Sequence, residues 1–351
     1  MVANHPVYGI EEEVFVLEPG RPSVRSLYYL ARLLWSDPRR YYTHSASNFS
    51  RGRDLWNGLM SGVEISTGKH DSIAGLIQDL AERRQDLAGV SQGLICPIGN
   101  LPDSTEATNT SGLHLHISGV DRLLACQRLV RYLPAFALAL AHAPYAGGRR
   151  FGQSFRWVHS YALGPLRSQI TYRFQDLIWS RRLGTIEVRV FDPSPDLSRL
   201  AALLECLHRL LTLEAGHTPA DGSEEKVAHI RYNQLREQAA RLRGETAHRG
   251  AAALAEEGTG LDGLVSELGE LVGFLPEWIA HTPADATATS LREKGPAATY
   301  LALDAGYRQW AGTPGWNGRQ VPLVFGAIAG FLGYYFPRLP YTIWKAWKEW
   351  S

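Results

Sequence analysis

The chain has 351 residues, with 36 lysines and arginines against 35 aspartates and glutamates, which gives a formal net charge of +1. This balance argues against a general nucleic-acid-binding protein, which carries a basic surplus to neutralise phosphates. The 45% hydrophobic and 20% charged residues are ordinary for a globular protein, and the chain is long enough to bury a substantial core.

The first half of the chain predicts strands mixed with helices. Alternation and β-branched composition predict strands at 7–17, 56–67, 113–118 and 185–191. Apolar residues at helical spacing predict helices at 24–35 and at 121–142. A further helix is expected to begin after Asp71, which would be its N-cap. The segment 149–178 is rich in aromatic residues and arginine and has no clean periodicity.

After Pro193 the pattern becomes mainly helical, with helices expected at 197–215, 224–243, 261–280 and 291–310. We expect a single α+β domain over residues 1–351: a mostly antiparallel sheet in 1–195 with the helices of 196–311 packed on it. A domain boundary near residue 195 is the alternative. Residues 312–351 form an aromatic C-terminal extension, compatible with a dimer interface or a lid.

The first strand carries paired carboxylates. Successive side chains of a strand point to opposite faces, so Glu11 and Glu13 share one face while Ile10, Glu12 and Val14 share the other. Two carboxylates about 7 Å apart repel each other, and a divalent cation such as magnesium relieves that repulsion. A solvated edge strand is the alternative.

Three later segments repeat this arrangement. His114 and His116 share a face of 113–118, Glu187 and Arg189 share a face of 185–191, and Glu64 lies between apolar neighbours. The imidazoles suit a metal or a polyphosphate, and arginine suits bidentate phosphate contacts. Ordinary polar-face histidines and a plain Glu–Arg ion pair are the alternatives.

If the strands pair in one sheet, one face packs on helices and the other gathers the ionisable residues. These residues are Glu11, Glu13, Glu64, His114, His116, Glu187 and Arg189. This composition favours a site for magnesium and triphosphate.

Four motifs carry a resemblance to a known family: 9–13 (GIEEE), 64–68 (EISTG), 112–116 (GLHLH) and 184–189 (GTIEVR). In order and spacing they resemble the glutamate–cysteine ligase type 2 family, the carboxylate–amine ligases, which is related to glutamine synthetase. The resemblance extends over about residues 7–245. It implies a sheet of the glutamine synthetase type and a reaction that depends on ATP and magnesium. ATP would phosphorylate the γ-carboxylate of glutamate, and an amine such as cysteine would then displace the phosphate.

The resemblance also implies residue roles. Two or three magnesium ions would be held by the residues Glu11, Glu13, Glu64, His114 and Glu187. His116 would contact nucleotide phosphate, and Arg189, catalytic together with Glu187, would stabilise the transferring phosphoryl group. Arg167, in an Arg-Ser pair, would hold the substrate carboxylate, and Asn233, in an Arg-Tyr-Asn motif, would support the nucleotide or substrate pocket.

Two other functions would use the same residues. One is a phosphotransferase of the guanidine kinase kind. The other is a non-catalytic nucleotide-binding interaction protein, since 295–301 lacks the family's Gln-Arg pair. We expect small-molecule substrates, no nucleic acid and no membrane partner; a homodimer is compatible with the sequence.

Three widely spaced cysteines, Cys96, Cys126 and Cys206, are typical of a reducing compartment. The N-terminus shows no signal peptide pattern. The apolar stretch 321–336, about 16 residues, is shorter than the roughly 20 that a spanning helix needs. The sequence therefore predicts a cytoplasmic protein.

Overall fold

The computed structural model describes most of the sheet and of the helices around it. The described residues are 5–18, 21–22, 26–37, 40–41, 46–47, 62–103, 110–156, 161–163, 175–180, 183–214 and 261–309, with the single positions 329, 337, 340 and 344. Arg167, Asn233, the helix expected at 224–243 and most of the C-terminal extension lie outside them.

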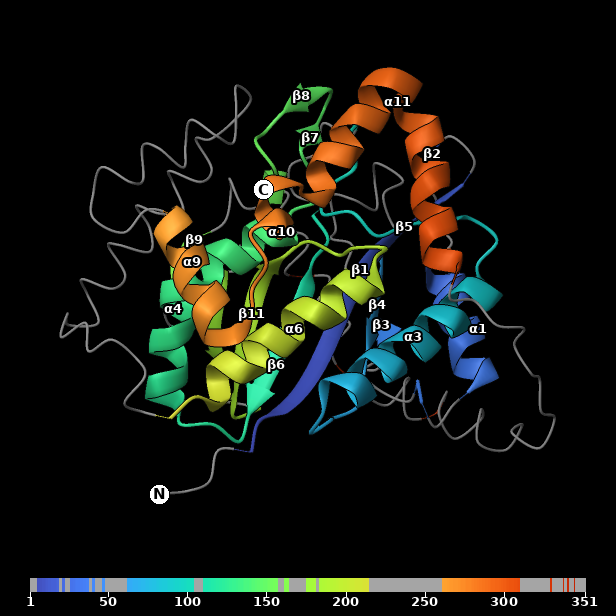
Figure 1. Ribbon diagram of the computed structural model, residues 1–351. Coiled ribbons are helices and arrows are strands. Elements are labelled where there is room, and N and C mark those ends of the chain that lie inside the picture. Colours follow the sequence, from blue (N-terminus) through green and yellow to red (C-terminus); the bar gives the residue numbers. More distant parts are fainter. Residues whose placement is uncertain are drawn as a thin grey trace.

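A mostly antiparallel sheet forms the centre of the molecule (Figure 1). Its strands are, in spatial order, β3 (Ala46–Ser47), β4 (Gly62–Ser66), β1 (Val7–Glu18), β6 (Leu113–Ser118), β11 (Thr185–Phe191), β10 (Gln175–Ser180) and β9 (Tyr161–Leu163). Two further strands, β2 (Arg21–Pro22) and β5 (Leu94–Cys96), also pair with β1, and β7 (Tyr145–Ala146) and β8 (Arg149–Arg150) form a separate hairpin. Among the described strands, β9 and β10 form the one parallel pair.

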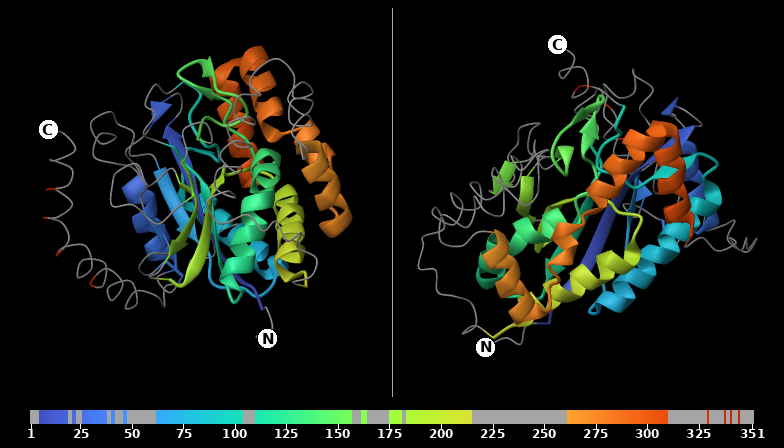
Figure 2. Two further views of the ribbon diagram at one scale, coloured as in Figure 1. Left: turned by 90° about the vertical axis from the view of Figure 1, so that its left-hand side faces the viewer. Right: turned by 45° about the horizontal axis from the view of Figure 1, so that its top comes forward.

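Helices pack on this sheet, as predicted for an α+β protein. They are α1 (Ser26–Ser36), α3 (Ile73–Val90), α4 (Arg122–Ala139), α6 (Leu197–Thr212), α9 (Leu261–Val272), α10 (Glu277–Ala280) and α11 (Pro283–Arg308). Figure 2 shows α4 and α6 against one face of the sheet, with α9 outside them.

The main core lies between this face and the helices. Ile10 and Val14 of β1 are fully buried there, together with Leu80 of α3, Leu133 of α4 and Leu207 of α6. Burial of these side chains is the main force that holds the helices to the sheet. A smaller cluster at the far end of β1 and β5 joins Phe15 and Cys96 to Tyr300 of α11.

Several predicted boundaries need correction. The N-cap of α3 is Ser72 and not Asp71: the Ser72 Oγ atom accepts the Gly75 N–H at 3.3 Å. The helix expected at 261–280 is two helices, because Gly273 has φ +75°, a left-handed conformation that ends α9. The last helix begins earlier than expected, at Pro283, and Gly295 with φ +79° kinks it.

Within the described residues, none of the helices has the length and apolar character needed to cross a bilayer. All three cysteines are free thiols, and Cys96 and Cys206 are buried.

Candidate active site

The register of the central strands brings the ionisable residues together. Glu11 of β1 lies opposite His114 of β6, and Glu13 of β1 lies opposite Glu64 of β4. His116 of β6 lies opposite Glu187 of β11. Directly opposed residues of antiparallel strands share a face, so all of these side chains lie on the face opposite the main core.

Three of these residues form a compact donor set. The His114 Nδ1 atom is 3.6 Å from Glu11 Oε2 and 3.8 Å from Glu187 Oε1. One ligand atom from each residue lies within 4.8 Å of the other two. The Nδ1 atom of His114 is buried without a hydrogen-bond partner among the described residues. Two carboxylates and one imidazole nitrogen are donors suited to a divalent cation, so this set fits a metal ion.

His116 extends the set toward the neighbouring strands. Its Nε2 atom is 3.4 Å from Glu11 Oε2, and its Nδ1 atom is 3.3 Å from the hydroxyl oxygen of Thr185. The same carboxylate oxygen of Glu11 thus lies within 4 Å of a nitrogen of each imidazole.

Two arginines add positive charge at this face. Arg189 donates a hydrogen bond to Glu187 two residues before it on β11. Arg156 is 3% exposed; its Nη2 atom is 3.2 Å from His114 Nε2 and its Nη1 atom is 3.9 Å from Glu13 Oε2. Arg156 is not among the residues predicted from the sequence, because it lies in a segment without periodicity.

Gly112 offers the signal that could have found it. A Cβ atom at Gly112 would lie 1.8 Å from Arg156 Nη1, so the glycine of the GLHLH motif leaves the space that the guanidinium occupies. At this position the lack of a side chain is what lets the arginine pack against the backbone.

The electrostatics favour a neutral His114 beside an ionised Glu11. Burial, reinforced by the charge of Arg189, lowers the pKa of His114 well below its usual value. Burial opposes ionisation of Glu11, but the two histidines outweigh it and lower the pKa of Glu11. Burial also opposes the charging of His116, but contact with Glu11 raises the pKa of that ring. Neutral imidazole and ionised carboxylate are the forms that coordinate metals.

A buried polar network follows the end of β11. Asp192 accepts hydrogen bonds from the His142 backbone N–H at 2.8 Å and from the Ser154 hydroxyl at 3.0 Å. Burial raises the pKa of Asp192 to about 6 despite these bonds. The network joins the ends of β11 and α4 to the segment that carries Arg156.

The structure thus places together all seven sheet residues that the sequence singled out, and adds Arg156. Arg167 and Asn233 lie outside the described residues. Glu12 points to the opposite face, as expected, where Arg84 of α3 donates to it from Nε at 3.0 Å. Both side chains are fully buried.

Comparison with known proteins relates this arrangement to other chains. No family model matches the sequence. A protein of Paracidovorax citrulli (strain AAC00-1) with the provisional name glutamate–cysteine ligase 2 is 28% identical over 152 residues, which cover 35% of this chain and 41% of that protein. The chain thus matches about two-fifths of the length of this relative.

Solved structures extend the likeness to nearly the whole chain. The glutamate–cysteine ligase of Francisella tularensis, in complex with AMP, superposes with a TM-score of 0.56 at 12% identity and covers 93% of this chain and 92% of that one. The chain has the fold of a glutamate–cysteine ligase. The bifunctional glutathione synthetase of Pasteurella multocida shares it, with a TM-score of 0.52 at 13% identity over 88% of this chain and 53% of that one. The predicted resemblance to glutamate–cysteine ligases is therefore confirmed.

Proposed function

We propose that the protein is an ATP-dependent carboxylate–amine ligase that joins the γ-carboxylate of glutamate to an amine such as cysteine. The observation that carries the proposal is the donor set of Glu11, His114 and Glu187 on a sheet of the glutamate–cysteine ligase fold. We further propose that this sheet is of the glutamine synthetase type. The AMP bound to the Francisella tularensis enzyme supports a nucleotide as one substrate.

The acidic residues are the proposed magnesium ligands. Glu11, His114 and Glu187 would hold one ion, and Glu13 and Glu64, which lie opposite each other on β1 and β4, would hold a second. Bound magnesium would neutralise and orient the phosphates of ATP. The low pKa of Glu11 keeps its carboxylate ionised, the form that coordinates metals, and burial keeps the His114 ring uncharged.

Arg189 and His116 are the proposed phosphate contacts. Arg189 has a raised pKa: burial opposes its charge, but the carboxylates of Glu187 and Glu13 outweigh burial and keep the guanidinium charged. A fixed positive charge beside the acidic cluster can stabilise the negative charge that develops during phosphoryl transfer. Arg167 and Asn233 keep their proposed substrate and nucleotide roles.

The proposed chemistry has two steps. A γ-carboxylate oxygen of glutamate attacks the γ-phosphorus of ATP, the bond from phosphorus to the β-γ bridging oxygen breaks, and ADP leaves. The amine nitrogen then attacks the acyl carbon, the acyl carbon–oxygen bond breaks, phosphate leaves, and the nitrogen loses a proton. The first step turns a carboxylate oxygen, a poor leaving group, into a phosphate, a good one. The proposed magnesium ions and Arg189 would offset the repulsion between the negative charges of ATP and of the carboxylate.

Purified protein with ATP, magnesium and glutamate, challenged with a panel of amines, tests the proposal. We expect phosphate release that requires an amine, and a product whose mass equals glutamate plus the amine minus water. Phosphate transferred to an acceptor would instead indicate a phosphotransferase. Binding of magnesium-ATP without turnover with any amine would indicate a nucleotide-binding protein.

A further inference from the structure

Arg156 lies among the proposed magnesium ligands without a part in the proposed reaction. Its guanidinium spans two strands, with Nη2 3.2 Å from His114 Nε2 on β6 and Nη1 3.9 Å from Glu13 Oε2 on β1. A buried guanidinium at this point must affect how the ligands are arranged.

The place of Arg156 depends on the lack of a side chain at Gly112. A Cβ atom there would lie 1.8 Å from Nη1 and 2.4 Å from the central carbon of the guanidinium. Gly112 is also tied to the sheet, because its carbonyl accepts the Glu13 N–H at 2.9 Å. A side chain at this position would therefore move the guanidinium while the backbone stays paired.

The hydrogen bond from Arg156 determines which nitrogen of His114 carries the proton. A guanidinium has five N–H donors and no acceptor, so His114 Nε2 accepts and is unprotonated. In a neutral ring the proton is then on Nδ1. That nitrogen faces Glu11 at 3.6 Å and Glu187 at 3.8 Å, where the cation would bind.

This arrangement is incompatible with a cation bound at Nδ1. A ligating neutral histidine offers a lone pair to the metal and donates its other N–H to an acceptor. Arg156 provides no acceptor at Nε2. The Arg156–His114 hydrogen bond and coordination through His114 Nδ1 therefore exclude each other.

We propose that Arg156 is a positioning residue that holds His114 in a cation-free arrangement and leaves Nε2 when a cation binds. This rests on the magnesium site of the proposed function. Carboxylates lie near the guanidinium as it leaves Nε2, because the charges of Glu13, Asp192 and Asp176 already act on it in its present position. The exchange sets the affinity of the site at His114, since a cation that binds there must break one buried, charge-assisted hydrogen bond.

Nuclear magnetic resonance of protein labelled with [15N]histidine tests the exchange directly. The His114 signals are assigned by their loss in His114→Asn. In cation-free wild type we expect Nδ1 to be protonated and Nε2 unprotonated, and magnesium should move the proton to Nε2. In cation-free Arg156→Met, Nε2 should be protonated in a large share of molecules. A protonated Nε2 in the cation-free wild type would overturn the proposal.

Manganese titration followed by electron paramagnetic resonance tests the effect on affinity. We expect Arg156→Met and Gly112→Ala each to bind Mn²⁺ about tenfold more tightly than wild type, the worth of one such hydrogen bond. Gly112→Ala retains the arginine charge, so its gain separates displacement from simple loss of positive charge. Arg131→Met is the control. It breaks the ion pair between Arg131 of α4 and Glu267 of α9, and it should bind Mn²⁺ as tightly as wild type does.

The outcomes distinguish the two proposals. Wild type that binds no Mn²⁺ would overturn the magnesium site and the role of Arg156 with it. Wild type that binds Mn²⁺, with unchanged or weaker binding in both Arg156→Met and Gly112→Ala, would overturn the role of Arg156 alone.

Discussion

Three consecutive glutamates on β1 have different environments because strand side chains alternate. Glu11 and Glu13 face the candidate site, whereas Glu12 is fully buried on the core face. There Arg84 donates to Glu12 and also to the Ser194 carbonyl at 2.7 Å, and the Tyr307 ring lies 4.9 Å from its guanidinium. The same short motif thus places two carboxylates at the candidate site and a third in a buried contact with helices α3 and α11.

At the site-facing positions we expect charge removal to abolish turnover. Glu11→Gln and Glu187→Gln should each lower the rate of amine-dependent phosphate release at least 100-fold, because each removes a proposed magnesium ligand. Glu267→Gln is the matched control: Glu267 pairs with Arg131 away from the site. Near-normal rates in both site variants would contradict the metal assignment.

At the core-facing position we expect a loss of stability. Arg84→Met leaves the fully buried Glu12 without its cation, which should cost about 3–5 kcal/mol of unfolding free energy. The double variant Glu12→Gln, Arg84→Met should recover a large part of that loss. Urea denaturation measures both, and equal losses in the single and double variants would refute the pairing.

The positions of single strands could be predicted from the sequence, but their pairing could not. The strands expected at 113–118 and 185–191 match β6 and β11 residue for residue, because strict alternation with small flanking turns is a local signal. That Glu11 opposes His114 is not local, since pairing joins segments about a hundred residues apart in the chain. Arg156 escaped prediction for the same reason: its contacts with Gly112, His114 and Glu13 join segments far apart in the chain.

The exact ends of helices were also not predictable from the local sequence, and the start of α3 offers a test. Asp71 and Ser72 both suit an N-cap, and the backbone selects Ser72. Ser72→Ala should therefore lower the free energy of unfolding by about 1 kcal/mol. Asp71→Ala, the neighbouring control, should change it little; the reverse order would contradict the assignment.

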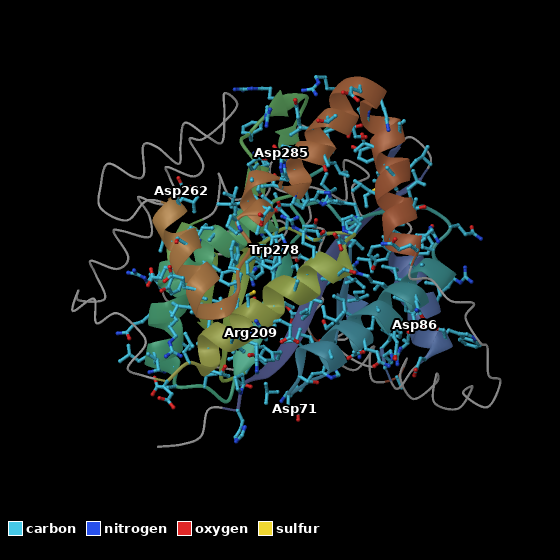
Figure 3. The ribbon with its side chains drawn as sticks, in the orientation of Figure 1. Asp71, Asp86, Arg209, Asp262, Trp278 and Asp285 are labelled. Carbon is cyan, nitrogen blue, oxygen red and sulfur yellow. The ribbon has the colours of Figure 1, made fainter. Side chains whose placement is uncertain are left out.

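The whole molecule separates an apolar, helix-covered side of the sheet from an ionisable side, and Figure 3 shows how side chains fill the space between sheet and helices. A net charge of +1 conceals this separation. The α+β class and the composition of the ionisable side followed from residue patterns, and the comparisons confirm the fold. The amine substrate did not follow, because the residues that these patterns single out are proposed contacts to metal and phosphate.

The buried Asp192 gives the molecule a pH-dependent stability. Burial raises the pKa of Asp192 to about 6, above the usual value of an aspartate. The contribution of the protonated carboxyl to the free energy of unfolding is therefore complete at low pH and is lost as pH rises through about 6. The difference from the usual value of about 3.9 corresponds to about 3 kcal/mol. The asparagine of the Asp192→Asn variant cannot ionise. The free energy of unfolding of this variant, relative to wild type, should therefore rise by up to that amount from about pH 4 to about pH 7. Urea denaturation across this range measures it, and a constant difference would contradict the burial effect.

The central claim is that the face formed by β1, β6 and β11 is a cation and nucleotide site. Anomalous diffraction from crystals soaked with Mn²⁺ and a non-hydrolysable ATP analogue tests it most directly. We predict a manganese peak bounded by Glu11, His114 and Glu187, with the analogue's phosphates toward Arg189. A manganese peak elsewhere with this face empty, or phosphates bound away from it, would contradict the account.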